Sequence, residues 1–142
     1  MTEALDDAAI APKAIEPIDE TPQAELLSEP RDGIPAVIDT LAELEVATES
    51  LRLGTGAVAV DADRASCYRY GQRAYLVQVF RRDAGVFLFD PPALGDFSPL
   101  QAAIGDVKWI FHAASQDLPS LRELDLLPPS IFDTELASRL LG

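Results

Sequence analysis

The pattern of hydrophobic and polar residues along the chain predicts a domain that mixes helices and strands. Apolar positions repeat at helical spacing from Leu41 to Leu51, with a Thr40 and Glu43 capping box before them and Gly54 after them. Shorter apolar or alternating runs predict strands. These strands are expected at residues 34–39, 57–63, 74–81, 85–90 and 107–111.

The order of these elements indicates the sheet type. The turn-forming residues 82–85 join two predicted strands as a hairpin, which makes that pair antiparallel. Later elements alternate: a short helix capped by Ser98, a strand, a helix after Asp117 and a final amphipathic helix after Asp133. An opening meander followed by helix–strand alternation is typical of an α/β domain with a mixed sheet.

The first 33 residues differ from the rest of the chain. They contain four prolines among scattered acids and no aromatic residue, a composition that cannot bury enough apolar surface to fold. We therefore predict a disordered acidic leader at residues 1–33, most simply a solvated spacer, and a folded domain at residues 34–142.

Charge and cysteine usage narrow the cellular setting. The net charge is −13, of which residues 1–34, with nine acids and two bases, supply −7. An acidic chain with one cysteine, no basic signal-like start and no membrane-length apolar run fits the reducing cytoplasm. Acidity argues against nucleic-acid binding, but five arginines gather within residues 64–82.

Two acids at the end of a predicted strand are the first candidate for chemistry. Asp61 and Asp63 point to the same side, about 7 Å apart along the backbone, because side chains alternate along a strand. Such a pair is costly unless a cation joins it, and Mg²⁺ or Mn²⁺ suits carboxylate oxygens. The simpler alternative is two solvated acids at a strand end.

Asp117, just past the strand at residues 107–111, is the third candidate. If that strand neighbours the one carrying Asp61 and Asp63, three carboxylates can converge on two divalent ions and support phosphodiester hydrolysis. The alternative is that Asp117 is a helix N-cap followed by Pro119. His112 has two interpretations as well, a metal ligand or a packed core residue.

The motifs together resemble a known family. Residues 60–64, 70–78, 89–91, 111–118 and 132–137 are similar, in order, to segments of ribonuclease D, a two-metal 3′-5′ exonuclease of the DEDD superfamily with a ribonuclease-H-like fold. The resemblance covers roughly residues 34–142. It implies a ribonuclease-H-like mixed sheet with flanking helices, and an exonuclease that trims RNA 3′ ends.

The resemblance also implies roles for particular residues. Asp61 would bridge two ions, Mg²⁺ or Mn²⁺, while Asp63 and Asp117 would each hold one. His112 would shape the floor of the site beside Asp117. For nucleic-acid contacts, RNA being favoured over DNA, the candidate substrate-binding residues are Arg64, Arg69, Arg73 and His112.

Two departures from the family pattern modify this prediction. Asp63 stands where the family has a glutamate, and the third motif, Tyr-x-x-x-Asp, is not reached by Gly142. We therefore expect an N-terminal portion of an exonuclease domain, incomplete at its C-terminus, with little or no activity alone. The alternatives are a degenerate exonuclease fold that binds RNA or protein without catalysis, and a related DNA exonuclease.

Overall fold

The computed structural model describes residues 25–64 and 73–142. The chain divides into two units, residues 1–31 and residues 32–142, and the second contains all of the described helices and strands. Most of the predicted leader lies outside the described residues, so its disorder stays a prediction.

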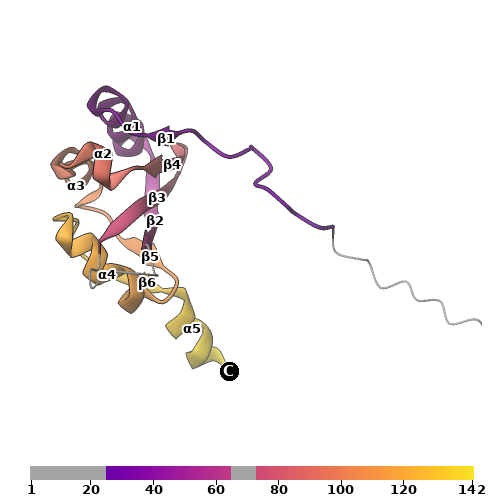
Figure 1. Ribbon diagram of the computed structural model, residues 1–142. Helices are drawn as coiled ribbons and strands as arrows, with labels where there is room; N and C mark the ends of the chain where they lie inside the picture. The colour runs from indigo at the N-terminus through magenta and orange to yellow at the C-terminus, as the bar shows by residue number, and fades with distance from the viewer. Residues whose placement is uncertain (1–24, 65–72) are drawn as a thin grey trace, which may run out of the picture. The chain divides into compact units, whose positions relative to one another are not determined.

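A six-stranded mixed sheet organises this unit, in the order β1-β4-β3-β2-β5-β6 (Figure 1). β2 pairs antiparallel with β3, and β3 with β4, whereas β5 runs parallel to both β2 and β6. This confirms the predicted α/β mixed sheet, the predicted hairpin and the neighbouring strands needed for the site. The strands are β1 Val37–Ile38, β2 Thr55–Arg64, β3 Ala74–Arg82, β4 Gly85–Phe89, β5 Trp109–Phe111 and β6 Ile131–Asp133.

Helices cover one face of the sheet. In Figure 1 the helices α1 to α4 lie on one side of it, and leucines from α1, α3 and α4 share one core with the inward residues of β2 and β5. Trp109 is fully buried there, and its indole N–H donates to the Ile104 carbonyl, so its polar atom is satisfied. The helices are α1 Leu41–Leu53, α2 Pro91–Leu94, α3 Ser98–Ile104, α4 Ala114–Glu123 and α5 Thr134–Leu141.

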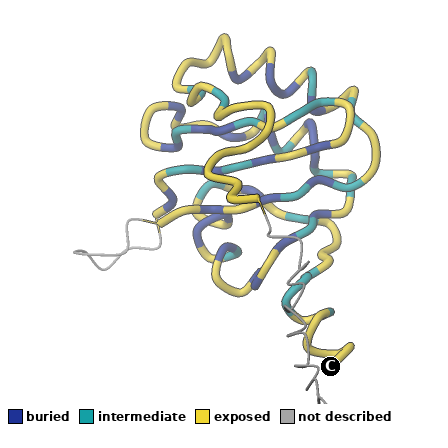
Figure 2. Tube along the Cα trace, turned by 90° about the vertical axis from the view of Figure 1, so that its right-hand side faces the viewer, coloured by how far each residue is buried: buried dark blue, intermediate teal, exposed yellow. Residues whose placement is uncertain are grey.

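The opposite face of the sheet is much more accessible. Figure 2 shows buried and accessible positions alternating along the strands. Ala57, Ala59 and Gln78 are half-buried on this face, and Phe80 is 49% exposed. The strand alternation therefore separates a packed interior from a surface on which polar chemistry can be placed.

A buried arginine joins α1 to β2. Arg81, on β3, is 7% exposed and donates from Nη1 to the Leu51 carbonyl at 2.7 Å and from Nε to the Gly56 carbonyl at 3.1 Å. A Cβ at Gly54 would lie 2.8 Å from Arg81 Cδ, so a side chain there would displace the arginine. The link fixes the turn through which the chain enters β2.

Some local predictions need correction. Thr40 caps α1 and Gly54 ends it as predicted, but Ser98 does not cap α3: Asp96 instead accepts from the Ser98 backbone N–H and hydroxyl. The short elements α2 and β6 were not predicted. Within residues 25–64 and 73–142, no helix is long and apolar enough to span a membrane.

Candidate active site

The two acids of β2 lie on the accessible face at the end of the strand. Val60 and Ala62 are buried in the core, while Asp61 and Asp63, which alternate with them, are exposed. The predicted same-face arrangement therefore follows from the strand period. Burial, with the neighbouring charge of Asp63 next in size, raises the pKa of Asp61.

A glutamine on the adjacent strand holds this pair. Gln78 of β3 lies opposite Asp61 in the register, and its Nε2 donates to Asp63 Oδ2 at 2.9 Å and to Asp61 Oδ2 at 3.3 Å. Gln78 falls within residues 70–78, one of the segments similar to ribonuclease D, but no role was predicted for it. The one signal was the polar residue itself, which becomes informative only once the register with Asp61 is known.

Asp117 comes to the same place from α4. It is 6% exposed in the first turn of that helix, and burial, with the charge of Asp61 next in size, raises the pKa of Asp117 to about 6. The positive charge of Arg64 and the backbone N–H of Ala62 act in the opposite direction. Asp117 therefore shares the electrostatic environment of the β2 acids.

The helix-cap alternative for Asp117 is wrong. The N-cap of α4 is Ala113, four residues earlier, and Pro119 lies inside the helix. The cap was misplaced because Ala113 has no side chain that can cap, so no local signal marks the start of the helix. Asp117 is consequently a buried acid in the first turn of α4, for which capping provides no explanation.

The predicted substrate-binding residues fall in different places. Arg64 ends β2 close enough to act on Asp117, and Arg73 is exposed just before β3, whereas Arg69 lies outside the described residues. His112 is exposed after β5, and its Nδ1 lies 3.0 Å from the Thr134 hydroxyl, which itself donates to the Phe111 carbonyl. His112 is thus not the packed core residue of the simpler alternative.

Comparison with known proteins identifies the family. Residues 35–142, about three quarters of the chain, match the model of a 3′-5′ exonuclease family. The chain belongs to the 3′-5′ exonuclease family. This confirms the family resemblance that the ordered motifs indicate.

Individual relatives of this exonuclease chain agree with that result. It is 37% identical over 109 residues to ribonuclease D of Haemophilus influenzae. The match covers 75% of this chain and 27% of the relative. A Bifidobacterium adolescentis protein structure is 47% identical with a TM-score of 0.78, over 82% of this chain and 29% of that chain. The structure of Escherichia coli RNase D is 29% identical with a TM-score of 0.67, over 75% and 29% respectively.

The matched region is a minor part of these proteins. The exonuclease chain spans about a quarter of the length of the Haemophilus ribonuclease D and under a third of the two structures. The fold and family therefore follow from the comparison, while the activity of an entire protein is a matter for proposal.

The three acids have the donor chemistry of a hard divalent cation site. Their carboxylate oxygens suit Mg²⁺ or Mn²⁺. The raised pKa values of Asp61 and Asp117 reflect burial and repulsion between the acids, and a bound cation would relieve the repulsion. Among the described residues, however, no three His, Cys, Asp or Glu side chains are grouped closely enough to hold one ion together. The three acids interact electrostatically but do not form a closed cage.

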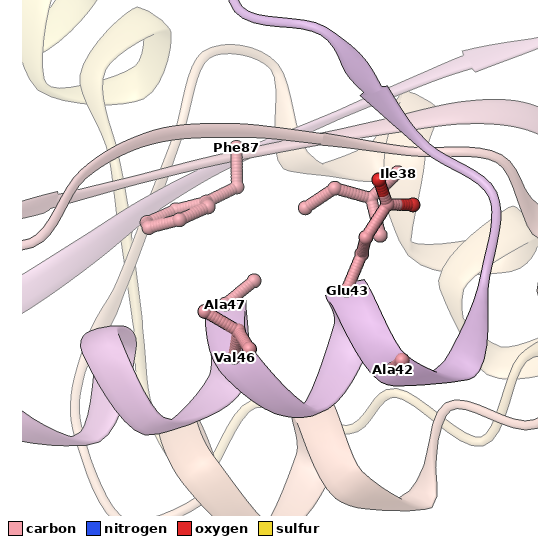
Figure 3. Close-up of a pocket in the computed structure, with 6 residues that line it drawn as sticks. All are labelled: Ile38, Ala42, Glu43, Val46, Ala47 and Phe87. Carbon is pink, nitrogen blue, oxygen red and sulfur yellow. The ribbon is translucent and has the colours of Figure 1, made fainter.

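The apolar pocket of this exonuclease chain is a separate feature. A cavity of about 390 Å³ lies between α1 and the β1–β4 edge of the sheet (Figure 3). Ile38, Val46, Ala47 and Phe87 are among its lining residues, and Glu43 is at its border. None of the predicted site residues lines it, so we locate the chemistry at the end of β2 and not in this pocket.

Proposed function

We propose that this chain carries acids of a 3′-5′ exoribonuclease site that hydrolyses terminal phosphodiester bonds. Family membership and the coupled acids Asp61, Asp63 and Asp117 support it. Relatives support RNA over DNA, since one is named ribonuclease D and another is described as an exoribonuclease involved in structured RNA processing.

The observation that carries the proposal is the approach of buried Asp117 to Asp61. A surface that served only solubility would gain nothing from a buried Asp117 whose pKa is raised by the charge of Asp61. Asp61, Asp63 and Asp117 would hold two divalent ions. When bound, Mg²⁺ or Mn²⁺ ions supply the Lewis acidity for water activation and leaving-group stabilisation, so no protein nucleophile is required.

The remaining residues would bind the nucleic acid. Arg64 at the end of β2 and Arg73 before β3 are close in the chain to the acids and suit phosphate oxygens; Arg69 is proposed on sequence alone. His112, exposed beside the start of α4, would contact substrate near Asp117. These contacts would orient the strand without reading its sequence.

The test replaces Asp61 by Asn in the full-length protein and follows shortening of a 5′-labelled RNA in Mg²⁺ or Mn²⁺. Turnover should fall at least ~1,000-fold, about 4 kcal/mol of transition-state stabilisation, with RNA binding largely kept. Asp39→Asn removes an exposed acid near β1 and should leave the rate unchanged. An unaltered rate for Asp61→Asn would refute the proposal.

We expect little turnover from residues 1–142 alone. Three carboxylates without a closed grouping among the described residues are a weak ligand set for two ions. Degradation of labelled RNA by the purified 142-residue chain at rates typical of an intact exonuclease would contradict this expectation.

A second candidate is a non-catalytic RNA- or protein-binding module on the same fold. It is favoured by the open grouping of acids and by the shorter Asp63 at the family's glutamate position. Its signature would be salt-sensitive RNA binding, weakened by Arg73→Gln, in a full-length protein that shows no metal-dependent cleavage.

A further inference from the structure

The start of α4 has an unusual backbone. Ala113, its N-cap, has φ 61° and ψ 56°, the left-handed conformation, and no side-chain cap of its own. A residue with a Cβ adopts this conformation reluctantly, so surrounding contacts must hold it. The first helical turn that follows contains Asp117.

A single carboxylate supplies those contacts. Asp133, at the end of β6, accepts from the N–H groups of Ala113 at 3.1 Å and Ala114 at 2.9 Å. It also accepts from Glu135 at 2.9 Å and Leu136 at 3.3 Å, as the N-cap of α5. One side chain thus satisfies the N-termini of two helices, and the Ala114 N–H contributes most to holding the pKa of Asp133 below its usual range.

The path from Asp133 to the acids is short. The Ala113 carbonyl, whose direction depends on the left-handed backbone, accepts from the Gln116 N–H at 2.9 Å. Asp117 is the next residue, and the charge of Asp61, on a strand two places from β6 in the sheet, acts on its carboxylate. A change in the backbone at Ala113 would therefore rotate the turn from which Asp117 projects.

We propose that Asp133 is a positioning residue for the exonuclease site. By binding the Ala113 and Ala114 N–H groups it holds the first turn of α4 so that Asp117 meets Asp61 at the end of β2. It touches none of the three acids and acts through the backbone. The inference rests on the proposed function, because it assigns the purpose of that placement to metal binding.

The simpler explanation is that Asp133 only stabilises the fold. Ala114, Ser120 and Leu121 are buried on α4 and pack it against the sheet independently of the cap. If packing alone sets the helix, removing the carboxylate would lower stability and leave Asp117 in place. The experiment has to separate these two outcomes.

The first variant is Asp133→Ser, which keeps an oxygen able to cap α5 but is too short to reach α4. Its matched control is Asp90→Ser, the same change at the N-cap of α2, where the carboxylate accepts from the Ala93 N–H at 3.1 Å. Mn²⁺ affinity, measured by titration of the folded 142-residue chain, should fall about 10-fold in Asp133→Ser and stay unchanged in Asp90→Ser. Reduced stability with unchanged Mn²⁺ affinity would overturn the proposal.

The second variant tests the route through Ala113. Glycine adopts positive φ without the cost of a Cβ, so Ala113→Gly in the Asp133→Ser background should restore most of the Mn²⁺ affinity. Amide hydrogen exchange at Ala114 should stay fast in the double variant, because the acceptor is still missing. Failure of the glycine to restore affinity would show that the effect does not run through Ala113.

A metal-free readout separates this inference from the proposed function. If the unaltered chain binds no Mn²⁺, the metal proposal fails and the positioning claim is decided by NMR. The backbone N–H of Ala62 hydrogen-bonds Asp117, so its NMR resonance should shift in Asp133→Ser and not in Asp90→Ser. An Ala62 resonance that stays in place would overturn the positioning role.

Discussion

The two faces of β2 differ as much as any two regions of the molecule, although their residues alternate along one strand. Val58, Val60 and Ala62 are at most 6% exposed beneath the helices, while Asp61 and Asp63 are exposed on the other side. The covered face stabilises the fold, and the accessible face bears charges that oppose it. Truncating an apolar residue of the core should therefore lower stability, whereas neutralising an acid that the fold holds close to other acids should raise it.

The largest effect is expected on the covered face. Leu44 of α1 is fully buried, and Leu44→Ala should lower the free energy of unfolding by about 3 kcal/mol through lost burial and a cavity. Leu53→Ala, at a 70% exposed position of the same helix, should cost less than about 0.5 kcal/mol. Urea unfolding of both variants measures the difference, and equal losses would contradict the assignment of the core.

Neutralising an acid should have the opposite sign. The pKa of Asp117, about 6 in the folded chain against an ordinary 3.8, means that the folded state holds the proton more tightly. Stabilisation by the protonated form is fully present below about pH 4 and is lost as pH rises through about 6. Asp117→Asn should thus be the more stable chain at pH 7, by about 1 kcal/mol after allowance for screening by water.

The control for this variant is its pH dependence. The difference between Asp117→Asn and the unaltered chain should vanish below about pH 4, and thermal unfolding across pH 3–8 measures it. In saturating Mg²⁺ the unaltered chain should gain more stability than Asp117→Asn, because the asparagine removes a charged ligand. A stability difference that is constant with pH would show that Asp117 does not titrate as described.

A smaller effect is expected where Gln78 holds the two exposed acids. Gln78→Met removes hydrogen bonds to two carboxylates and should cost about 0.5–1 kcal/mol without divalent ions. The cost should shrink in saturating Mg²⁺, which would neutralise the same carboxylates. The free energy of unfolding with and without Mg²⁺ tests this. The control is Gln101→Met: the Gln101 side-chain amide on α3 hydrogen-bonds the backbone of Leu127, and its loss should be insensitive to the ion.

The smallest effect concerns a polar group on the covered side. Ser120 of α4 is fully buried, and its hydroxyl has no hydrogen-bond partner among the described residues. Ser120→Ala should raise the free energy of unfolding by about 0.5 kcal/mol, because the alanine leaves no unpaired oxygen behind. A clear loss of stability in urea unfolding would indicate that the hydroxyl does have a partner.

The sequence was most informative for features that depend on residues close together in the chain. The run from Ala57 to Asp63 predicts the strand and its two faces because alternation needs no knowledge of the partner strands. The Thr40 cap and the hairpin at residues 82–85 are equally local, and the structure confirms both.

What sequence reasoning missed depends on distant residues. The N–H of Ala113, the N-cap of α4, donates to Asp133, twenty positions later, and Gln78 becomes informative only because the register brings it opposite Asp61. β6 was missed because a three-residue strand is too short for a periodic pattern. The order of the strands predicted that Asp117 lies near Asp61. It gave no indication that Asp117 is buried.

The buried Arg81 has a consequence for how this chain can change. β2 pairs irregularly with β3 between Thr55 and Val58, next to the carbonyls that the guanidinium binds. A strand that lost this anchor could slip by one residue, and every side chain beyond the slip would change sides. Asp61 and Asp63 would then enter the core while Val60 and Ala62 turned outward. By fixing the register, the arginine determines which side chains of β2 face the core. A single-residue insertion or deletion near Gly54 should therefore be far less tolerated than a two-residue one, which keeps each side chain on its face.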